Sequence, residues 1–144
     1  MARSLDELLA AAAATIDRLQ PPEAWAAVEA GAVLVDTRST DARRLYGVVP
    51  GSLHVPRTVL EWRLQPGGPW RNAYAPDVGD PVLVLCDAGL SSVFAAAQLV
   101  ELGYTRAGDV IGGFAAWRRA GLPWHPGTDP PQTRDEVPGM RPPE

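Results

Sequence analysis

The only cysteine of the chain, Cys86, is the side chain that the sequence best places to act as a nucleophile. It follows an apolar run over residues 81–85, and a short polar loop separates it from a helical pattern that ends at Gly103. A short, partly β-branched apolar run predicts a buried strand. The thiol is therefore expected at the carboxyl end of a strand, facing the start of a helix, which is where open α/β sheets bind ligands.

A cysteine reacts as its thiolate, and the free backbone N–H groups at a helix N-terminus favour negative charge. A loop that curls from Cys86 to Ser91 can aim several amides at the sulfur or at a bound oxyanion. Gly89 allows this bend because glycine adopts positive φ angles, and Ser91 or Ser92 is expected to cap the helix. The alternative is that Cys86 is a small, buried and inert residue. The local pattern leaves both interpretations open.

Composition excludes several classes of protein. The 144 residues predict one domain, and the net charge of −4 comes without a Lys/Arg cluster. Nucleic acid and anionic membranes are therefore not expected as partners. One cysteine cannot form an internal disulfide or a cysteine-based zinc site, and no metal or organic cofactor is expected. No apolar run approaches the roughly 20 residues that span a bilayer, so a cytoplasmic location is expected.

Short apolar strands alternate with helices along the chain, which predicts an α/β fold: a roughly five-stranded parallel sheet with helices on both faces. Residues 1–18 are expected to form an N-terminal helical extension, and the proline-rich residues 126–144 a flexible tail. The strands are expected at 16–20, 32–35, 53–56, 81–85 and 109–111, and the helices at 4–15, 21–29, 40–46, 58–64, 91–102 and 114–120.

Three polar side chains near other strands are predicted to be structural. Asp36 and Arg38 end the second strand, close to the expected site crevice. We expect Asp36 to cap the next segment and Arg38 to pair with a carboxylate inside the fold, because arginine is suited to buried ion pairs. His54 lies between apolar neighbours, which favours a core histidine over a catalytic base.

Four segments in this order resemble the signatures of the single-domain rhodaneses, and the resemblance covers most of the chain as a rhodanese-like domain over residues 19–125. Val48 stands where the family usually has a histidine, just before the second segment. The segments are Asp36-Thr37-Arg38 after a strand, Val49-Pro50-Gly51-Ser52 before His54, the loop Cys86-Asp87-Ala88-Gly89-Leu90-Ser91-Ser92, and Gly112-Gly113 followed by Trp117 and Gly121-Leu122-Pro123.

The resemblance implies a sulfurtransferase in which Cys86 holds a sulfane sulfur as a persulfide and passes it to a thiol or to cyanide. The implied partners are a small sulfur donor, thiosulfate or a low-molecular-weight persulfide, and a thiol acceptor that can be a protein thiol. Acidic Asp87 and apolar Leu90 fit a protein thiol or a small persulfide about as well as thiosulfate. The residues expected to bind substrate are Asp87, Ala88, Gly89, Leu90, Ser91 and Ser92, with Arg57 and Arg63 reaching over from outside the loop.

Two other functions remain to be weighed. Phosphatases and arsenate reductases of similar fold use Cys-x5-Arg, but here the sixth residue after Cys86 is Ser92. Without an arginine in the loop, a phosphoryl oxyanion lacks its bidentate partner. The second alternative is a non-catalytic interaction or sulfur-sensing module that selects a protein partner through the loop at 65–79 or the tail. The complete cysteine loop favours the enzyme.

Overall fold

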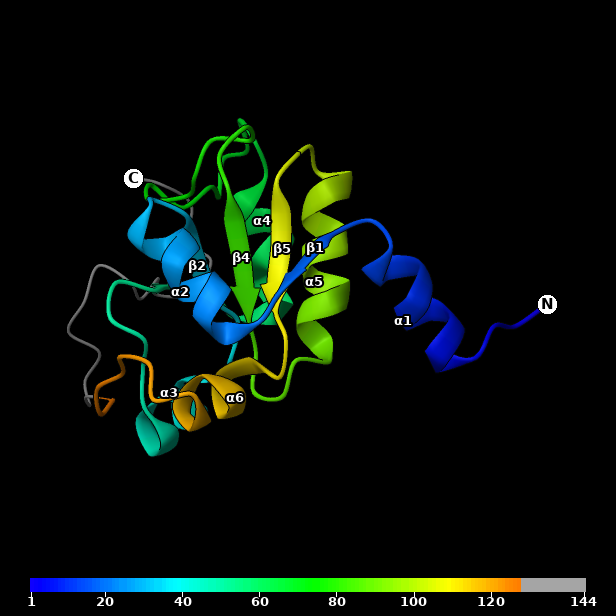
Figure 1. Cartoon of the computed structure of the whole chain (residues 1–144). Coiled ribbons are helices and arrows are strands. Elements are labelled where there is room, and N and C mark those ends of the chain that lie inside the picture. Colours follow the sequence, from blue (N-terminus) through cyan, green and yellow to red (C-terminus); the bar gives the residue numbers. More distant parts are fainter. Residues whose placement is uncertain (128–144) are drawn as a thin grey trace.

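A computed structural model describes residues 1–127, in which five strands form one sheet (Figure 1). The tail expected from Pro126 onward lies, beyond Gly127, outside the described residues. The elements in chain order are α1 (Leu5–Ala13), β1 (Asp17–Leu19), α2 (Pro21–Glu29), β2 (Val33–Asp36), α3 (Thr40–Tyr46), β3 (Leu53–His54), a 3₁₀ turn η1 (Arg57–Val59), α4 (Leu60–Leu64), β4 (Val82–Leu85), α5 (Ser91–Glu101), β5 (Ala107–Val110) and α6 (Gly113–Arg119).

The sheet has the strand order β1-β5-β4-β2-β3, and every neighbouring pair is parallel. The predicted fold class is therefore confirmed. The last strand begins two residues earlier than the sequence predicts. Ala107 and Gly108 have little β propensity, but they pair with β4, and a Cβ at Gly108 would collide with the carbonyl of Asp17 on β1. Close packing between strands, rather than propensity, sets this boundary.

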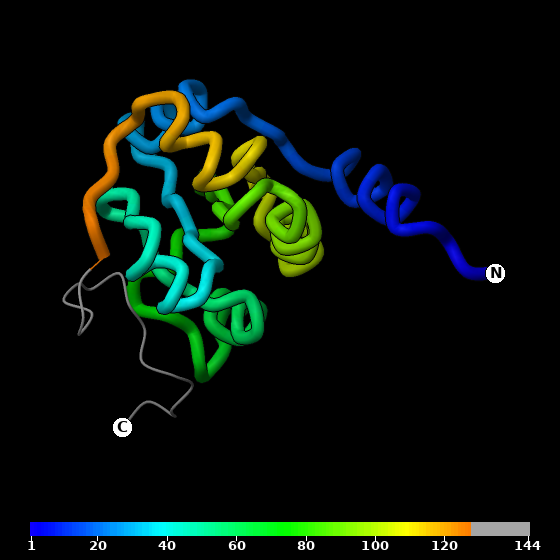
Figure 2. The backbone as a smooth tube through the Cα atoms, turned by 90° about the horizontal axis from the view of Figure 1, so that it is seen from below, coloured from blue at the N-terminus to red at the C-terminus, as the bar shows by residue number. Residues whose placement is uncertain are grey.

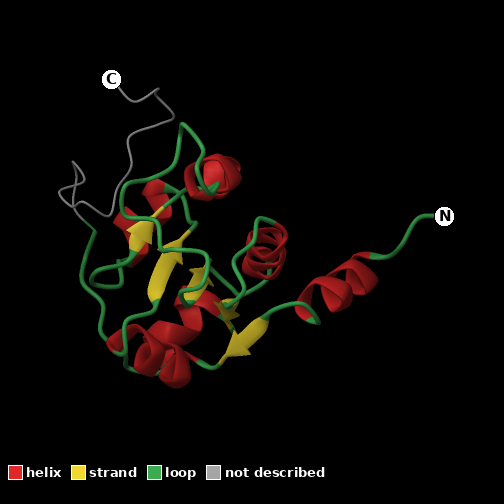
Figure 3. Ribbon diagram, turned by 90° about the horizontal axis from the view of Figure 1, so that it is seen from above, coloured by secondary structure: helices red, strands yellow, loops and turns green. Residues whose placement is uncertain are grey.

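The sheet is covered on both faces, and the side chains of β4 show how (Figure 3). Val82 and Val84 belong to an apolar cluster with α4 and α5. Leu83 and Leu85 belong to a second cluster with α2 and α6. Successive side chains of a strand point to opposite faces, so a continuous apolar run fills both cores. This double burial makes β4 a rigid support for the residue that follows it.

The N-terminal helix α1 stands beside α5 and extends away from the body of the domain (Figure 2). Ser4 and Glu7 form a capping box at its start, and no residue of α1 is buried. The strand β1 begins at Asp17, so the sheet starts within the residues expected as an extension. In its register, Arg18 lies opposite Asp109 on β5. The segment before the family-like region thus contributes an edge strand.

None of the helices within residues 1–127 has the length and apolar character needed to cross a membrane.

A buried ion cluster holds the carboxyl end of β2. Asp36 accepts hydrogen bonds from Nε and Nη2 of Arg38 at 3.0 and 2.8 Å, and from Nη1 of Arg43 at 3.1 Å. These side chains are almost completely buried. The Arg38 carbonyl lies 2.7 Å from Nε2 of His54, and burial lowers the pKa of His54. Arg38 and His54 therefore have the structural roles expected of them, and Arg43 is an additional partner of Asp36. The expectation that Asp36 caps the next segment is wrong, because Ser39 is the N-cap of α3 and Asp36 is held by the two arginines.

The Asp36 cluster predicts a large stability effect. Asp36→Asn should lower the free energy of unfolding by about 3 to 5 kcal/mol, because it leaves the buried guanidinium of Arg38 without its counter-charge. Urea unfolding followed by circular dichroism measures this. Asp41→Asn is the matched control, since Asp41 pairs with Arg44 at 2.8 Å on the surface, and the expected loss there is below about 0.5 kcal/mol. Equal losses in the two variants would contradict the assigned role.

Candidate active site

The thiol of Cys86 lies buried at the carboxyl end of β4, at the start of a tight loop. The backbone N–H of Gly89 donates to Sγ at 3.2 Å. Gly89 has a φ of +81°, and a Cβ there would collide with the backbone of Gly112. Only glycine satisfies both the conformation and the close approach. The loop therefore presents an amide to the sulfur, as the sequence predicts.

The first turn of α6 holds the loop from the other side. Phe114 N–H donates to the carbonyl of Cys86 at 2.8 Å, and Ala115 N–H donates to the carbonyl of Asp87 at 3.1 Å. A Cβ at Gly113 would collide with this same stretch of backbone. The Gly-Gly turn that the sequence singled out is thus a close contact between the helix and the cysteine loop.

The expectation that Ser91 or Ser92 caps α5 is wrong. Leu90 occupies the N-cap position without a side-chain cap, and Ser91 is the first helical residue. The buried hydroxyl of Ser92 turns toward the strand ends, where it donates to Oδ2 of Asp109 at 2.7 Å and accepts from the Cys86 thiol at 3.2 Å. The hydrogen bond from this hydroxyl to a carboxylate is charge-assisted and about twice as strong as a neutral one, which explains the direction in which Ser92 turns.

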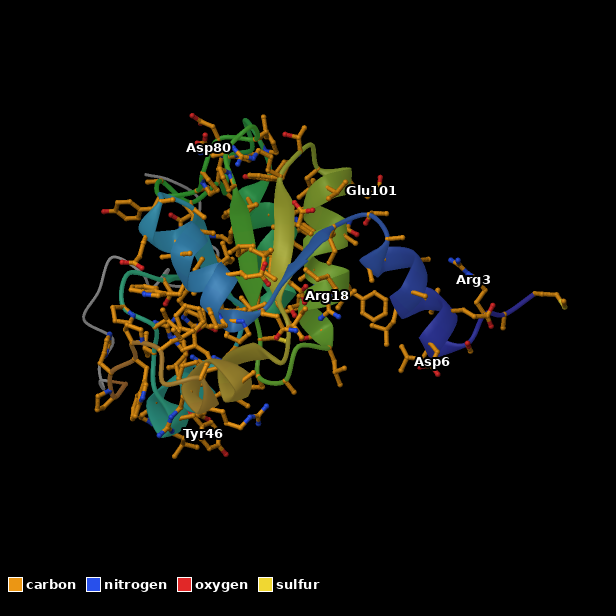
Figure 4. The ribbon with its side chains drawn as sticks, viewed as in Figure 1. Arg3, Asp6, Arg18, Tyr46, Asp80 and Glu101 are labelled. Atoms are coloured by element: carbon orange, nitrogen blue, oxygen red, sulfur yellow. The ribbon has the colours of Figure 1, made fainter. Side chains whose placement is uncertain are left out.

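Asp109 and Arg18 are site residues that the sequence analysis missed. Arg18 binds the carboxylate through Nε at 2.8 Å and Nη2 at 3.1 Å, and Nη2 also donates to the Gly89 carbonyl at 3.1 Å. Asp109 is completely buried, and Figure 4 shows Arg18 near the end of α5 opposite to Glu101. A carboxylate inside a short apolar strand requires a partner. The position of Asp109 within the predicted last strand was therefore the feature of the sequence that could have indicated a buried ion pair.

These contacts set the protonation of the thiol. Burial raises the pKa of Cys86, but the hydrogen bonds around the sulfur, among them those from the backbone amides of Ser92 and Gly89, outweigh burial, and the pKa lies below its ordinary value. A thiol with these donors around it is suited to nucleophilic chemistry. Within residues 1–127, no three His, Cys, Asp or Glu side chains form a metal-binding group.

The remaining residues predicted to bind substrate lie partly on the cysteine loop and partly on η1 and α4. Asp87, Ala88 and Leu90 are exposed on the loop. Arg57 instead pairs with Glu61 at 2.8 Å, and burial lowers the pKa of Arg63 on α4. Among the hydrogen bonds of the described residues, neither arginine side chain contacts the cysteine loop. Substrate binding by these two residues stays a prediction.

A cavity of about 720 Å³ adjoins the loop at Asp87. Its cationic side chains are Arg118 and Arg119 of α6, which the sequence analysis did not single out. Arg118 donates to the carbonyl of Tyr46 at 3.2 Å and lies 3.9 Å over the ring of Trp124. Figure 4 shows Tyr46 at the end of the domain where α3 and α6 meet. The cavity is lined by Tyr46, Asp87, Phe114, Ala115, Arg118 and Arg119.

Comparison with known proteins agrees with this geometry, since residues 20–120 match the rhodanese-like domain. The chain belongs to this family. The thiosulfate sulfurtransferase GlpE of Actinobacillus succinogenes is 39% identical over 107 residues, which cover 73% of this chain and 86% of that protein. The expected family membership is therefore confirmed.

Two solved structures extend the comparison. A protein of unknown function from Rhodopseudomonas palustris, described as a possible tyrosine phosphatase, is 30% identical with a TM-score of 0.75 over 87% of this chain and 96% of its own. The polysulfide-sulfur transferase homodimer from Wolinella succinogenes is 25% identical with a TM-score of 0.69, covering 86% and 88% of the two chains. Both matches include most of this rhodanese-like chain.

The Gly89 amide predicts a specific loss of reactivity. Gly89→Ala should slow alkylation of Cys86 at neutral pH several-fold, because a Cβ displaces the loop from Gly112 and moves the amide away from Sγ. Iodoacetamide labelling followed by mass spectrometry measures the rate. Gly67→Ala is the matched control, since Gly67 also has a positive φ but nothing lies within 4 Å of an added Cβ. Equal rates in the two variants would contradict this role of the loop.

Proposed function

We propose that this chain is a rhodanese-type sulfurtransferase that carries the sulfur as a persulfide on Cys86. The observation that supports this most directly is the buried thiol with the Gly89 amide directed at Sγ, within a Cys-x-x-Gly-x-Ser-Ser loop. A thiolate needs such donors, and the outer sulfur of a persulfide needs them equally. The names of the relatives, a thiosulfate sulfurtransferase and a polysulfide-sulfur transferase, support the same class.

The reaction follows from a single nucleophile. The Cys86 thiolate attacks the sulfane sulfur of a donor, a new S–S bond forms, and the bond within the donor breaks with its electron pair on the departing group. An acceptor thiolate then attacks the outer sulfur, and the Cys86 thiolate leaves. Cys86 is the only cysteine, so the acceptor is an external thiol or cyanide.

The cavity beside Asp87 is the proposed docking place for donor and acceptor. Arg118 and Arg119 set two positive charges against the carboxylate of Asp87 at this mouth. This offsets the repulsion that Asp87 alone would exert on an anionic donor such as thiosulfate. A low-molecular-weight persulfide or a protein thiol fits the same opening, because the cavity is also lined by Tyr46 and Phe114. We place the reaction in the cytoplasm.

Phosphatase chemistry is not favoured, although one structural neighbour is described as a possible tyrosine phosphatase. Ser92 stands where Cys-x5-Arg has its arginine, and its hydroxyl contacts Cys86 and Asp109. The remaining alternative is a rhodanese-like module that binds a partner without turnover. Such a module has no need of an amide directed at a thiol with a lowered pKa.

The persulfide step is tested by intact mass. The reduced protein is incubated in turn with thiosulfate, 3-mercaptopyruvate and glutathione persulfide, and we expect a gain of one sulfur atom, about 32 Da, with at least one donor. Cyanide should remove the added mass, and Cys86→Ser should never acquire it. A folded protein whose thiol is alkylated normally but gains no mass from any donor would favour the interaction module.

The cavity is tested by removing one charge at a time. Arg119→Gln should raise KM for thiosulfate several-fold with little change in kcat, because a cation at the mouth attracts the dianion. Added salt should reduce the difference between variant and wild type. Arg106→Gln is the control, since Arg106 lines a separate cavity with Asp17 and Asp80 at the opposite end of the strands. The same KM increase in both variants would indicate a non-specific charge effect.

A further inference from the structure

The hydroxyl of Ser92 has one hydrogen and two neighbours that compete for it. It donates to Oδ2 of Asp109 at 2.7 Å, and its oxygen accepts from the Cys86 thiol at 3.2 Å. A serine has a single O–H donor. While Asp109 holds this hydrogen, Ser92 supports the thiol form of Cys86 and not the thiolate. The carboxylate also brings a negative charge behind the sulfur, which opposes the thiolate further.

Arg18 acts in the opposite direction. Its guanidinium neutralises Asp109 through two hydrogen bonds, and its Nη2 also donates to the Gly89 carbonyl at 3.1 Å. This second contact holds the residue whose N–H reaches Sγ at 3.2 Å. The positive charge and the fixed amide both favour the thiolate. Arg18 lies on the edge strand β1, just before residues 20–120, which match the family. The effect of Arg18 on the thiol therefore comes from outside the matched region.

We propose that Asp109 and Arg18 are positioning residues with opposite effects on Cys86: Asp109 withholds the Ser92 hydrogen and favours the thiol, while Arg18 fixes the Gly89 amide and favours the thiolate. The proposal rests on the proposed function in one respect, namely that the thiolate is the attacking species. Together the two residues set how much of Cys86 is ready to attack a donor.

The other charged groups at this end of the sheet do not substitute for the pair. Asp87 is the exposed neighbour of Cys86 on the loop. On β2, Asp36 is bound to Arg38, whose guanidinium lies 4.0 Å over the ring of Phe114. The lone acid of α5, Glu101, is at the far end of that helix, and the cations of α6 line the cavity with Asp87. Arg18 and Asp109 are the charged side chains hydrogen-bonded into the Cys86–Ser92 network.

The test is the pH dependence of Cys86 alkylation by iodoacetamide in the full chain, where the single cysteine makes the signal unambiguous. Asp109→Asn should move the midpoint of the curve of labelling rate against pH to lower pH. At pH values below the wild-type midpoint, labelling should be several-fold faster. The new amide can donate to Ser92 Oγ, which frees the hydroxyl hydrogen for the sulfur, and a negative charge is lost. Arg18→Gln should move the midpoint to higher pH and slow labelling below it several-fold.

Opposite signs distinguish positioning from simple structural damage, which would move both variants the same way. The double variant should lie between the two single variants. Asp41→Asn and Arg44→Gln serve as controls, because they break a surface pair on α3, and their midpoints should equal that of wild type. Midpoints that move together, or do not move, in folded Asp109→Asn and Arg18→Gln would overturn the proposal.

A further variant decides the question if Asp109→Asn fails to fold by circular dichroism. Ser92→Ala should leave the midpoint unchanged or lower it, since the hydrogen of Ser92 is committed to Asp109. A clear rise would show that Ser92 donates to the thiolate and would overturn the proposal. Persulfide formation is measured separately by intact mass. Persulfide formation without the expected midpoint shifts rejects this inference alone, and the shifts without a persulfide reject the proposed function alone.

Discussion

A single buried carboxylate joins the edge of the sheet to the reactive thiol. Asp109 sits inside β5, where an unpaired charge would cost several kcal/mol. Arg18 and Ser92 satisfy it, and each of them also touches the cysteine loop: Arg18 at the Gly89 carbonyl and Ser92 at Sγ. The need to pair one charge therefore organises three elements around the site, and the same contacts bear on the protonation of Cys86.

Backbone packing supplies the second constraint. The cysteine loop and the Gly-Gly turn before α6 approach so closely that neither Gly89 nor Gly113 has room for a Cβ. The hydrogen bond from Phe114 N–H to the Cys86 carbonyl closes this contact. The loop amides keep their direction because the backbone has no space to relax. Rigid presentation of an amide is what a site needs in order to stabilise charge that develops on sulfur.

The apolar core explains why these constraints hold. β4 is buried on both faces, so the strand that Cys86 directly follows is held by both apolar clusters. The ion cluster around Asp36 secures the end of the neighbouring strand β2. At the mouth, by contrast, Asp87 and Leu90 are exposed, and Arg118 and Arg119 line the adjoining cavity. Rigid strand ends below Cys86 and an exposed, charged entrance suit a site that takes sulfur from one partner and gives it to another.

The sequence by itself determined the α/β sheet, the place of Cys86 at a strand end and the pairing of Arg38 with a carboxylate inside the fold, because apolar periodicity, turn glycines and the chemistry of single side chains are local signals. Only the tertiary structure decided that the Ser92 hydroxyl donates to a carboxylate instead of capping a helix, and that Arg18 contacts the cysteine loop. Arg18 and Asp109 are far apart in the chain but register partners in the sheet. Such a pairing depends on strand order, which the residues flanking either position do not encode.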